Sequence, residues 1–358
     1  MTKGIVDLFC EMARVDSESG NEQRFISYMA ELLRQELGGS TMLDAHGNLI
    51  CKVPARDSEA SSSILFVAHA DTVSPGVGIE PVVRNGAILS SGDTILGADD
   101  KAGIAEVVEA VRTAPRRPPV EIALTLSEET TQAGARNLDL SLIDSKWAFV
   151  VDADDLNEIV VGGPTYIALD IGIRGRAAHA GLQPEAGLSA IRVAAEGVLN
   201  AMEGRIDEET TANLGIIRGG EIRNGVPEHV SIQGECRSLV HEKALLHVGV
   251  MRQAFEAAAA RSGAELVFSD RIELRAARFA SESAIVQRAV EAVSSVGLVP
   301  AVKVIIGATD ALILANRGLE AVALGMGAKE AHTTREQISI SDLETGARIL
   351  RHLLCHTA

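Results

Sequence analysis

The chain has 358 residues, of which 46% are hydrophobic, and a formal net charge of −16. This length allows two domains, because single hydrophobic cores stop growing near roughly 250–300 residues. The negative charge excludes a protein that binds nucleic acid nonspecifically, since phosphate contacts need clustered Lys and Arg.

No membrane span is predicted, because the longest apolar runs are short and interrupted by charged residues. The first seven residues carry one Lys and an early Asp, and no apolar stretch of a secretion signal follows, so we expect a cytoplasmic location. The four cysteines lie far apart without a Cys-x-x-Cys pair and are expected to be free thiols.

The first part of the chain predicts alternating helices and strands. Residues 5–37 have helical hydrophobic spacing, with a break near 16–21. Three apolar runs then resemble buried parallel strands, and a helix at about 101–113 separates the first two. These runs are Ile64–Ala68, Val120–Leu126 and Ala148–Val151.

The middle of the chain has a different pattern. A strand at 166–173 leads to a helix at 184–202, two strands at 212–218 and 230–239, a helix at 242–261 and a strand at 265–272. This βαββαβ order is the ferredoxin-like unit. The α/β pattern resumes near 280. We therefore predict an α/β fold in which a discontinuous domain, 1–165 and 274–358, receives an inserted domain, 166–273.

Metal-ligand side chains follow three of the predicted parallel strands. The first strand ends in His69-Ala70-Asp71, the second in Glu128-Glu129 after one serine, and the third in Asp152. Sites in open α/β sheets collect beyond the carboxyl ends of strands. Grouped carboxylates repel one another unless cations neutralise them. The pattern therefore indicates a metal site at this edge of the sheet.

Each motif alone has an ordinary structural explanation. An acidic pair such as Asp99-Asp100 is common at a helix start, and Glu128-Glu129 is common in a solvated turn. In His-x-Asp at a strand end, residues i and i+2 point to the same side, so Asp71 could orient His69. The joint occurrence of these motifs favours a metal site over the separate explanations.

Taken together, the motifs resemble the M20 family of metallopeptidases, within it the peptidase T (tripeptide aminopeptidase)-like branch. The resemblance covers the whole chain in order. Its motifs are His69-Ala70-Asp71-Thr72-Val73, Leu96–Gly103, Glu128-Glu129, Asp152, Ala178–Gly181, Asn224–Pro227, Gly234–Ser238, Gly307–Ala311 and Ala331–Thr334. Asp310 in Gly307–Ala311 is predicted to be a helix N-cap near the site.

The resemblance implies a zinc-peptidase-like catalytic domain with a mixed, mostly parallel sheet and two zinc ions, with Co or Mn as alternatives. Asp99 would bridge the two metals, His69 and Asp152 would complete one shell, and Glu129 and His332 the other. A metal-bridging water would be the nucleophile and Glu128 the general base. The resemblance also implies a cis peptide bond between Asp99 and Asp100.

For the inserted domain, the resemblance implies substrate contacts and a homodimer. His179 would stabilise the oxyanion in the partner subunit's site. Asn224 and Arg237 would hold a substrate carboxylate or backbone. His179 and Arg237 also have structural explanations, in a Gly-flanked turn and on a strand.

The resulting prediction is an exopeptidase acting on small peptides, as a tripeptide-type aminopeptidase. An N-acyl amino acid deacylase or carboxypeptidase of the same family would have an identical metal core, and a non-catalytic relative would lack a ligand or the base. No Gly-x-Gly-x-x-Gly opens a helix after a strand, which disfavours a nucleotide enzyme.

Overall fold

The structure is a computed structural model and describes residues 4–355. It divides into two compact units. The larger comprises the described parts of Met1–Gly162, Arg278–Val304 and Thr309–Ala358, and the smaller comprises Gly163–Ala277 with Ile305–Ala308. Two short strands, β9 (Gly162–Gly163) and β15 (Ala277–Arg278), pair where the chain passes between the units.

The larger unit contains an eight-stranded mixed sheet. Its order is β1-β2-β6-β3-β7-β17-β8-β16. The pairs β6/β3, β3/β7, β7/β17 and β8/β16 are parallel, whereas β1/β2, β2/β6 and β17/β8 are antiparallel. The strands are β1 (Ser40–Leu43), β2 (Leu49–Val53), β3 (Ile64–His69), β6 (Val120–Thr125), β7 (Trp147–Ala153), β8 (Glu158–Val160), β16 (Ala301–Lys303) and β17 (Glu320–Gly325).

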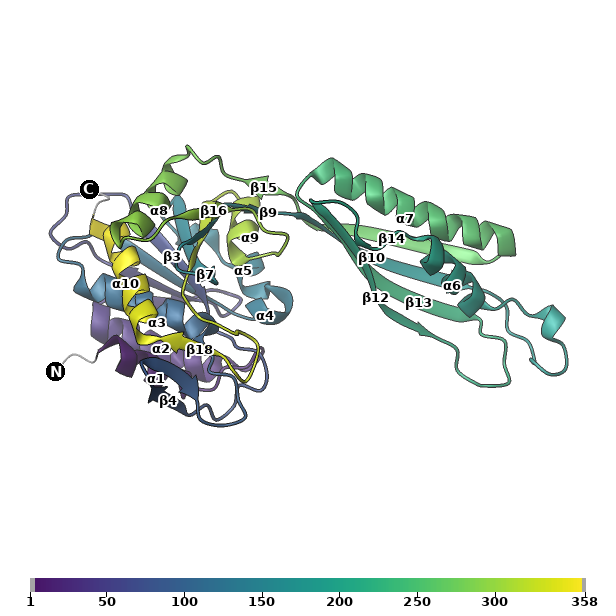
Figure 1. The fold of residues 1–358 in the computed structure, drawn as a ribbon, viewed down its shortest axis with the longest axis horizontal. Helices are drawn as coiled ribbons and strands as arrows, with labels where there is room; N and C mark the ends of the chain where they lie inside the picture. The colour runs from purple at the N-terminus through teal and green to yellow at the C-terminus, as the bar shows by residue number, and fades with distance from the viewer. Residues whose placement is uncertain (1–3, 356–358) are drawn as a thin grey trace. The chain divides into compact units, whose positions relative to one another are not determined.

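The central strands are buried along their whole length. All six residues of β3 and all six of β6 are buried, as expected for strands covered by helices on both faces. Side chains from the sheet share one hydrophobic core with several helices, and α3 and α10 lie side by side (Figure 1). These helices are α1 (Ile5–Ala13), α2 (Gln23–Leu37), α3 (Ala98–Thr113), α8 (Ala284–Ser295) and α10 (Ile340–Cys355).

The remaining elements of the larger unit are short. Helix α5 contacts α9 and strand β6, and α9 also contacts β7 and β17. A separate antiparallel sheet has the order β18-β5-β4. The elements are α4 (Glu128–Thr131), α5 (Ala133–Asn137), the 3-10 helix Leu140–Leu142, α9 (Asp310–Asn316), β4 (Pro81–Arg84), β5 (Ala87–Ser90) and β18 (Gln337–Ser339).

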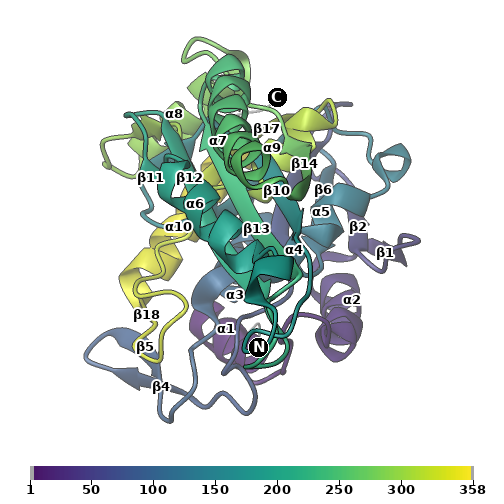
Figure 2. The same cartoon turned by 90° about the vertical axis from the view of Figure 1, so that its right-hand side faces the viewer.

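The smaller unit is an antiparallel sheet with two helices packed against it (Figure 2). The strand order is β11-β12-β13-β10-β14, so the βαββαβ unit has the ferredoxin-like arrangement with β11 added at one edge. The elements are β10 (Thr165–Arg174), the 3-10 helix Pro184–Ala186, α6 (Ala190–Asn200), β11 (Gly204–Arg205), β12 (Thr210–Gly219), β13 (His229–Ser238), α7 (His241–Ser262) and β14 (Glu265–Leu274).

The predicted fold class is confirmed, including the mixed sheet and the βαββαβ pattern. The helix predicted at 184–202 begins later, at Ala190. Ser189 has extended backbone angles, and its hydroxyl accepts a hydrogen bond from the backbone N–H of Arg192. This is an N-cap, which satisfies one of the unpaired donors of the first turn and fixes the start of the helix.

Candidate metal centre

His69 is the last residue of β3 and is buried. Its Nε2 lies 3.0 Å from Oδ1 of Asp99 and 3.6 Å from Oδ1 of Asp152. Its Nδ1 lies 2.9 Å from the backbone oxygen of Asp71 and 3.5 Å from Oδ1 of the same residue. One ring nitrogen is thus held by Asp71, which leaves the other directed at two carboxylates from different elements.

Asp99 lies between two imidazole rings. Its Oδ1 faces His69 at 3.0 Å, and its Oδ2 faces Nε2 of His332 at 3.2 Å. Asp99 stands at the start of α3, where Gly97 takes a left-handed conformation as the N-cap. The peptide bond between Asp99 and Asp100 is cis, as the family resemblance implies. Because each carboxylate oxygen faces a different histidine, Asp99 has the geometry of a bridging ligand.

Glu129 and His332 form the second half of the cluster. Nε2 of His332 lies 2.9 Å from Oε1 of Glu129. Glu129 is in the short helix α4 that follows β6, and His332 is in the loop between β17 and β18. Residues that lie at four separate places in the sequence, 69, 99, 129 and 332, are therefore brought to one edge of the sheet.

Two groups of residues could each hold a metal ion, because within each group the ligand-type atoms lie within 4.8 Å of one another. One group is His69, Asp100 and Asp152, and the other is His69, Asp99 and Glu129. Asp100 is the less suitable ligand of the two adjacent aspartates. Its Oδ2 accepts the backbone N–H of His69 at 3.1 Å, and its Oδ1 lies against the Cα of Gly103, where an added Cβ would be 2.3 Å away. Asp100 thus faces the start of α3, whereas Asp99 faces both histidines.

Two of the clustered acids, Asp152 and Glu129, have raised pKa values. Burial, reinforced by the charges of Asp99 and Glu128, raises the pKa of Asp152 well above its usual range against the opposing effect of His69. Burial and the charge of Asp99 raise the pKa of Glu129 to about 7. Grouped carboxylates in a site closed to water are destabilised when ionised, and bound cations remove that penalty.

The histidines respond in the opposite direction. Burial lowers the pKa of His69, but its bonds to Asp152, Asp71 and Asp99 outweigh burial and raise it well above the usual range. The hydrogen bond that the His332 ring donates to the carboxylate of Asp99 raises the pKa of His332 to about 9. In the protein alone, these rings offset part of the negative charge by holding protons. The donor set of two imidazoles and three carboxylates suits zinc and similar divalent cations, so the residues fit a divalent metal centre.

Asp71 organises the residues around the cluster. Its Oδ1 accepts the backbone N–H of Glu128 at 2.9 Å, and its Oδ2 accepts that of Glu129 at 3.2 Å. The hydroxyl of Ser19 donates to Oδ2 at 2.7 Å. Burial raises the pKa of Asp71, but the stronger effects of its partners, first His69, lower it below its usual value. Asp71 is therefore an ionised carboxylate that fixes His69 and both glutamates.

Glu128 directly precedes Glu129 in α4 and carries a further carboxylate beside this cluster. Its Oε1 accepts a hydrogen bond from Nε2 of Gln132 at 3.0 Å. Burial, together with the charges of Asp99 and Asp71, raises its pKa above the usual value. A carboxylate with a raised pKa is suited to proton transfer near neutral pH.

The predicted substrate residues lie in the smaller unit. His179 is exposed, and its Nδ1 accepts the backbone N–H groups of Gly181 and Leu182, each at 3.2 Å. Asn224 lies on the neighbouring segment, since its backbone oxygen accepts the N–H of Ala180 at 2.9 Å. Because Nδ1 of His179 accepts, the neutral ring carries its proton on Nε2.

Arg237 lies on β13 and is already paired. Its guanidinium donates to both carboxylate oxygens of Glu235 at 2.9 Å and lies over the ring of Tyr166 at 4.7 Å. A weaker contact of 3.5 Å joins its Nη1 to the backbone oxygen of Ile306. The remaining N–H groups of the guanidinium are those that a ligand could use.

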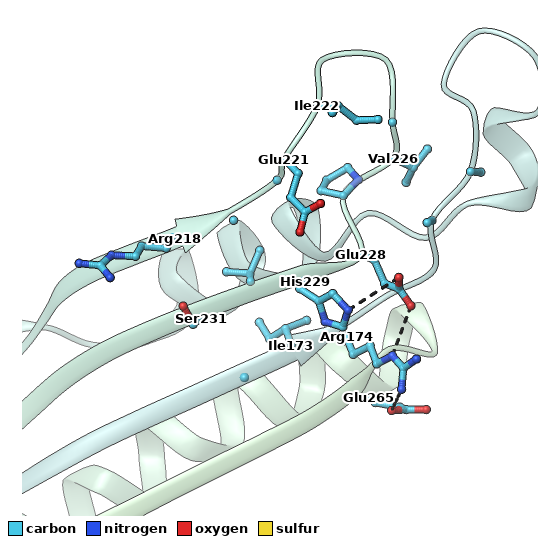
Figure 3. A pocket seen from close by; sticks show the side chains of 18 of the residues that line it. Ile173, Arg174, Arg218, Glu221, Ile222, Val226, Glu228, His229, Ser231 and Glu265 are labelled. Carbon is cyan, nitrogen blue, oxygen red and sulfur yellow. Dashed lines mark hydrogen bonds and ion pairs between the residues drawn. The ribbon is translucent and has the colours of Figure 1, made fainter.

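A cavity of about 850 Å³ adjoins the segments of His179 and Asn224 within the smaller unit. Ala178, Gly225 and Val226 line it, together with the ends of strands β10, β12, β13 and β14. Figure 3 shows its charged side, where Arg174 pairs with Glu228 and Glu265. The charged residues of its lining are Arg174 and Arg218 with Glu221, Glu228 and Glu265, so acidic side chains outnumber basic ones by one.

The contacts of two supporting carboxylates, Asp310 and Glu22, were not predicted. Asp310 was predicted as an N-cap, but Thr309 caps α9, and Asp310 is buried with its Oδ2 accepting the hydroxyl of Thr125 at 2.7 Å. Glu22 accepts both the backbone N–H and the hydroxyl of Ser127 at 3.1 Å, which fixes the residue before Glu128. No local pattern signals these contacts, because the partners are distant in the sequence.

No helix among residues 4–355 combines the length and the apolar character that a membrane crossing requires.

Comparisons with known proteins agree with this geometry. The model of the peptidase family M20/M25/M40 matches residues 65–356. The Bacillus subtilis protein YqjE, which is uncharacterized, is 34% identical over 97% of this chain and 96% of its own length. The crystal structure of an aminopeptidase PepT from Bacillus cereus is 36% identical, with a TM-score of 0.89 over 98% of this chain and 97% of that chain.

A tripeptidase from Staphylococcus aureus has a similar structure. It is 30% identical, with a TM-score of 0.91 over 98% of this chain and 97% of that chain. The chain is therefore similar to peptidase T-like proteins, and the similarity extends over both units.

Proposed function

Since this chain belongs to the peptidase family M20/M25/M40 and is a metal-dependent peptidase of that family, we propose that it is a dinuclear-zinc exopeptidase that hydrolyses small peptides. More specifically, we propose a tripeptide-type aminopeptidase. Relatives that cover nearly all of the chain are an aminopeptidase and a tripeptidase, which supports this choice over other members of the family.

The observation that carries the proposal is the position of Asp99 between His69 and His332. Its two oxygens lie 3.0 and 3.2 Å from the Nε2 atoms of these residues. Asp99 would bridge two metal ions, with His69 and Asp152 completing one shell, and Glu129 and His332 the other. Cobalt or manganese would fit the same nitrogen and oxygen ligands.

Two divalent cations, when bound, lower the pKa of a water molecule to about 7 and polarise the carbonyl of the scissile amide. Glu128 would act as general base and accept a proton from the attacking water on its carboxylate. It would then give that proton to the leaving amine. Burial raises its pKa, which brings the carboxyl toward the range where it can both accept and release a proton at neutral pH.

Asp71 would hold this machinery in place. It contacts the ring of His69 and the backbone of Glu128 and Glu129. A second partner of this kind fixes the tautomer and orientation of a ligating histidine.

His179 would supply a hydrogen bond to the developing oxyanion. Its Nδ1 accepts two backbone N–H groups, so Nε2 is the donor in the neutral ring. Asn224 and Arg237 would hold the substrate backbone or its terminal carboxylate. Because Arg237 is bidentate to Glu235, it would bind substrate through its outer N–H groups or by exchanging partners.

We also propose that two chains associate through the smaller unit. On the outer edge of β12, only Thr211 and Ala212 pair with β11, so the rest of this edge is open. Ile216 and Ile217 on the same strand are exposed. Helix α7 exposes Leu245 and Leu246. An open strand edge and exposed apolar side chains are features of an interface. A molar mass of twice 37.7 kDa by light scattering would support the dimer, and a monomer would contradict it.

A cytoplasmic location is part of the same proposal. Cys10, Cys51, Cys236 and Cys355 are free thiols, and proteins of oxidising compartments commonly pair theirs.

The test combines metal analysis with substrate comparison. We expect two divalent ions per chain, loss of activity with a chelator and recovery with zinc. A tripeptide with a free amino group should be hydrolysed at least tenfold faster than its N-acetylated form. Preference for the blocked peptide would favour an N-acyl amino acid deacylase or carboxypeptidase. Two bound metals without hydrolysis of either substrate would indicate a non-catalytic relative.

A further inference from the structure

Glu336 is a buried carboxylate that lies outside the proposed ligand set. It directly precedes β18 and follows His332 by four residues, in the same loop. Only 1% of its surface is exposed. A buried carboxylate is destabilising unless its oxygens accept hydrogen bonds, so its partners identify what it does.

The partners of Glu336 are three backbone N–H groups at the start of α3. Its Oε2 accepts from Leu96 at 2.8 Å and from Gly97 at 2.7 Å, and its Oε1 accepts from Asp99 at 2.9 Å. Hydrogen bonds to an ionised acceptor are about twice as strong as neutral ones. The carboxylate therefore fixes the turn from which Asp99 extends.

This turn needs an external support. Gly97 is left-handed, and Asp99 and Asp100 have non-helical backbone angles, so the first turn of α3 departs from regular helical geometry. The carboxylate supplies acceptors to N–H groups that a helix start leaves unpaired. It also complements the positive end of the helix dipole.

The other end of the connection is the His332 loop. The backbone N–H of Glu336 donates to the oxygen of Thr333 at 3.0 Å, and Lys329 and Gln337 exchange two backbone hydrogen bonds across the base of the loop. His332 itself has a left-handed backbone, with φ of 63°. The loop is thus a closed turn, and Glu336 ties it to the turn of Asp99.

We propose that Glu336 is a positioning residue that sets the bridging Asp99 and His332 at the correct separation for the metals. The inference rests on the proposed metal centre. Two ligands on separate loops must be held within about 0.5 Å of the productive geometry, and a buried carboxylate that joins both loops provides this constraint.

Glu336→Gln tests the inference with little change in size. The amide of glutamine has one acceptor oxygen and one donor NH2 group in place of the two acceptor oxygens of the carboxylate. Its NH2 group must therefore face either the N–H of Asp99 or the N–H groups of Leu96 and Gly97, and the hydrogen bonds on that side are lost. The matched control is Glu330→Gln, which removes a carboxylate from the same loop. Glu330 pairs with Arg335 at 3.0 Å on the surface, and within residues 4–355 no hydrogen bond joins its side chain to the Asp99 turn.

Three measurements give the expected result. Hydrogen exchange in the apoprotein should become at least tenfold faster at residues 96–99 in Glu336→Gln and remain unchanged in Glu330→Gln. Calorimetric titration with Zn²⁺ should show at least tenfold weaker binding of one ion. With both sites saturated, kcat for a tripeptide should fall at least tenfold while KM changes less than threefold. Glu336→Asp keeps the charge but shortens the reach, so its losses should be intermediate.

Other outcomes would overturn the inference. A purely structural role would lower the thermal midpoint of Glu336→Gln but leave zinc affinity and kcat within threefold of the wild type. If Glu336→Gln does not fold, Glu336→Asp decides on the same criteria. If the wild-type protein binds fewer than two metal ions, the proposed function fails as well. Two bound ions in the wild type with unchanged affinity in the variants would refute only the role of Glu336.

Discussion

Replacing Glu128 with Gln removes the charge of the proposed general base with little change in the size of the side chain. The backbone N–H at position 128 would still donate to Asp71, and the new amide oxygen could still accept from Gln132. Glu129 would keep its own bond to Asp71. The substitution therefore alters proton transfer and leaves the ligand geometry in place.

The expected loss can be sized from the role of the residue. General base catalysis contributes about 10²–10⁴-fold to a rate. At about 1.36 kcal/mol for each factor of ten, the barrier should rise by roughly 3–5 kcal/mol. The charge of Glu128 also raises the pKa values of Asp152 and Asp310, so its removal should lower both. Metal binding should be maintained, because Asp152 would ionise more readily.

Steady-state kinetics with a tripeptide and metal analysis of the same preparation would test this expectation. We expect kcat at least 100-fold lower, KM within threefold of the wild type, and unchanged metal content. Gln132→Ala is the control, since it removes a hydrogen bond to Glu128 and keeps the carboxylate; its kcat should fall less than tenfold. Activity of Glu128→Gln within tenfold of the wild type would refute the assignment of the base.

Three further predictions concern metal binding and stability. Asp99→Asn should lower metal affinity, measured by calorimetry, and kcat by about 100-fold or more. This loss should exceed the 10–100-fold that is typical when a residue that hydrogen-bonds a metal ligand is removed, because Asp99 is itself a proposed ligand. Removing the metals with a chelator should lower the free energy of unfolding, which denaturant titration can measure. The expected loss is about 2.7 kcal/mol for each site if the free metal concentration had been about 100 times its dissociation constant. Glu106 is buried, neither of its oxygens has a hydrogen-bond partner within residues 4–355, and burial raises its pKa well above the usual value. The folded chain therefore retains a proton that the unfolded chain releases above about pH 4.5, and stability falls by up to about 1.4 kcal/mol per pH unit until the folded pKa is reached. Glu106→Gln should remove this loss, so its thermal midpoint should rise relative to the wild type between pH 5 and pH 8, whereas the exposed Glu291→Gln should show no such trend.

The side chains proposed as metal ligands could be selected from the sequence because several of them follow the strands directly. His69 ends β3, and Asp152 lies near the end of β7, so strand prediction alone places both at one edge of the sheet. The assignment of His332 needed the family resemblance, since it lies in a loop after a strand without a local signal. The structure places it 2.9 Å from Glu129, where the resemblance implies a shared metal.

The supporting carboxylates could not be predicted in the same way. Glu336 contacts the turn of Asp99 across a large sequence separation, and its own surroundings read as an ordinary polar loop before a strand. Asp310 stands next to the true cap, Thr309, and an acidic residue at a helix start is most simply interpreted as the cap itself. Long-range hydrogen bonds of this kind depend on how loops close, which neither periodicity nor composition encodes.

The contacts of Asp71 have a consequence for anyone who redesigns this enzyme. The same carboxylate touches the ring of His69 and the amides of Glu128 and Glu129. Substitutions at these four positions will not have additive effects, because each changes the environment of a shared partner. A double-mutant cycle between Asp71 and His69 should therefore show a coupling free energy of roughly 0.5–3 kcal/mol. Libraries that vary the residues around the proposed metal centre would best leave this aspartate unchanged and diversify the smaller unit.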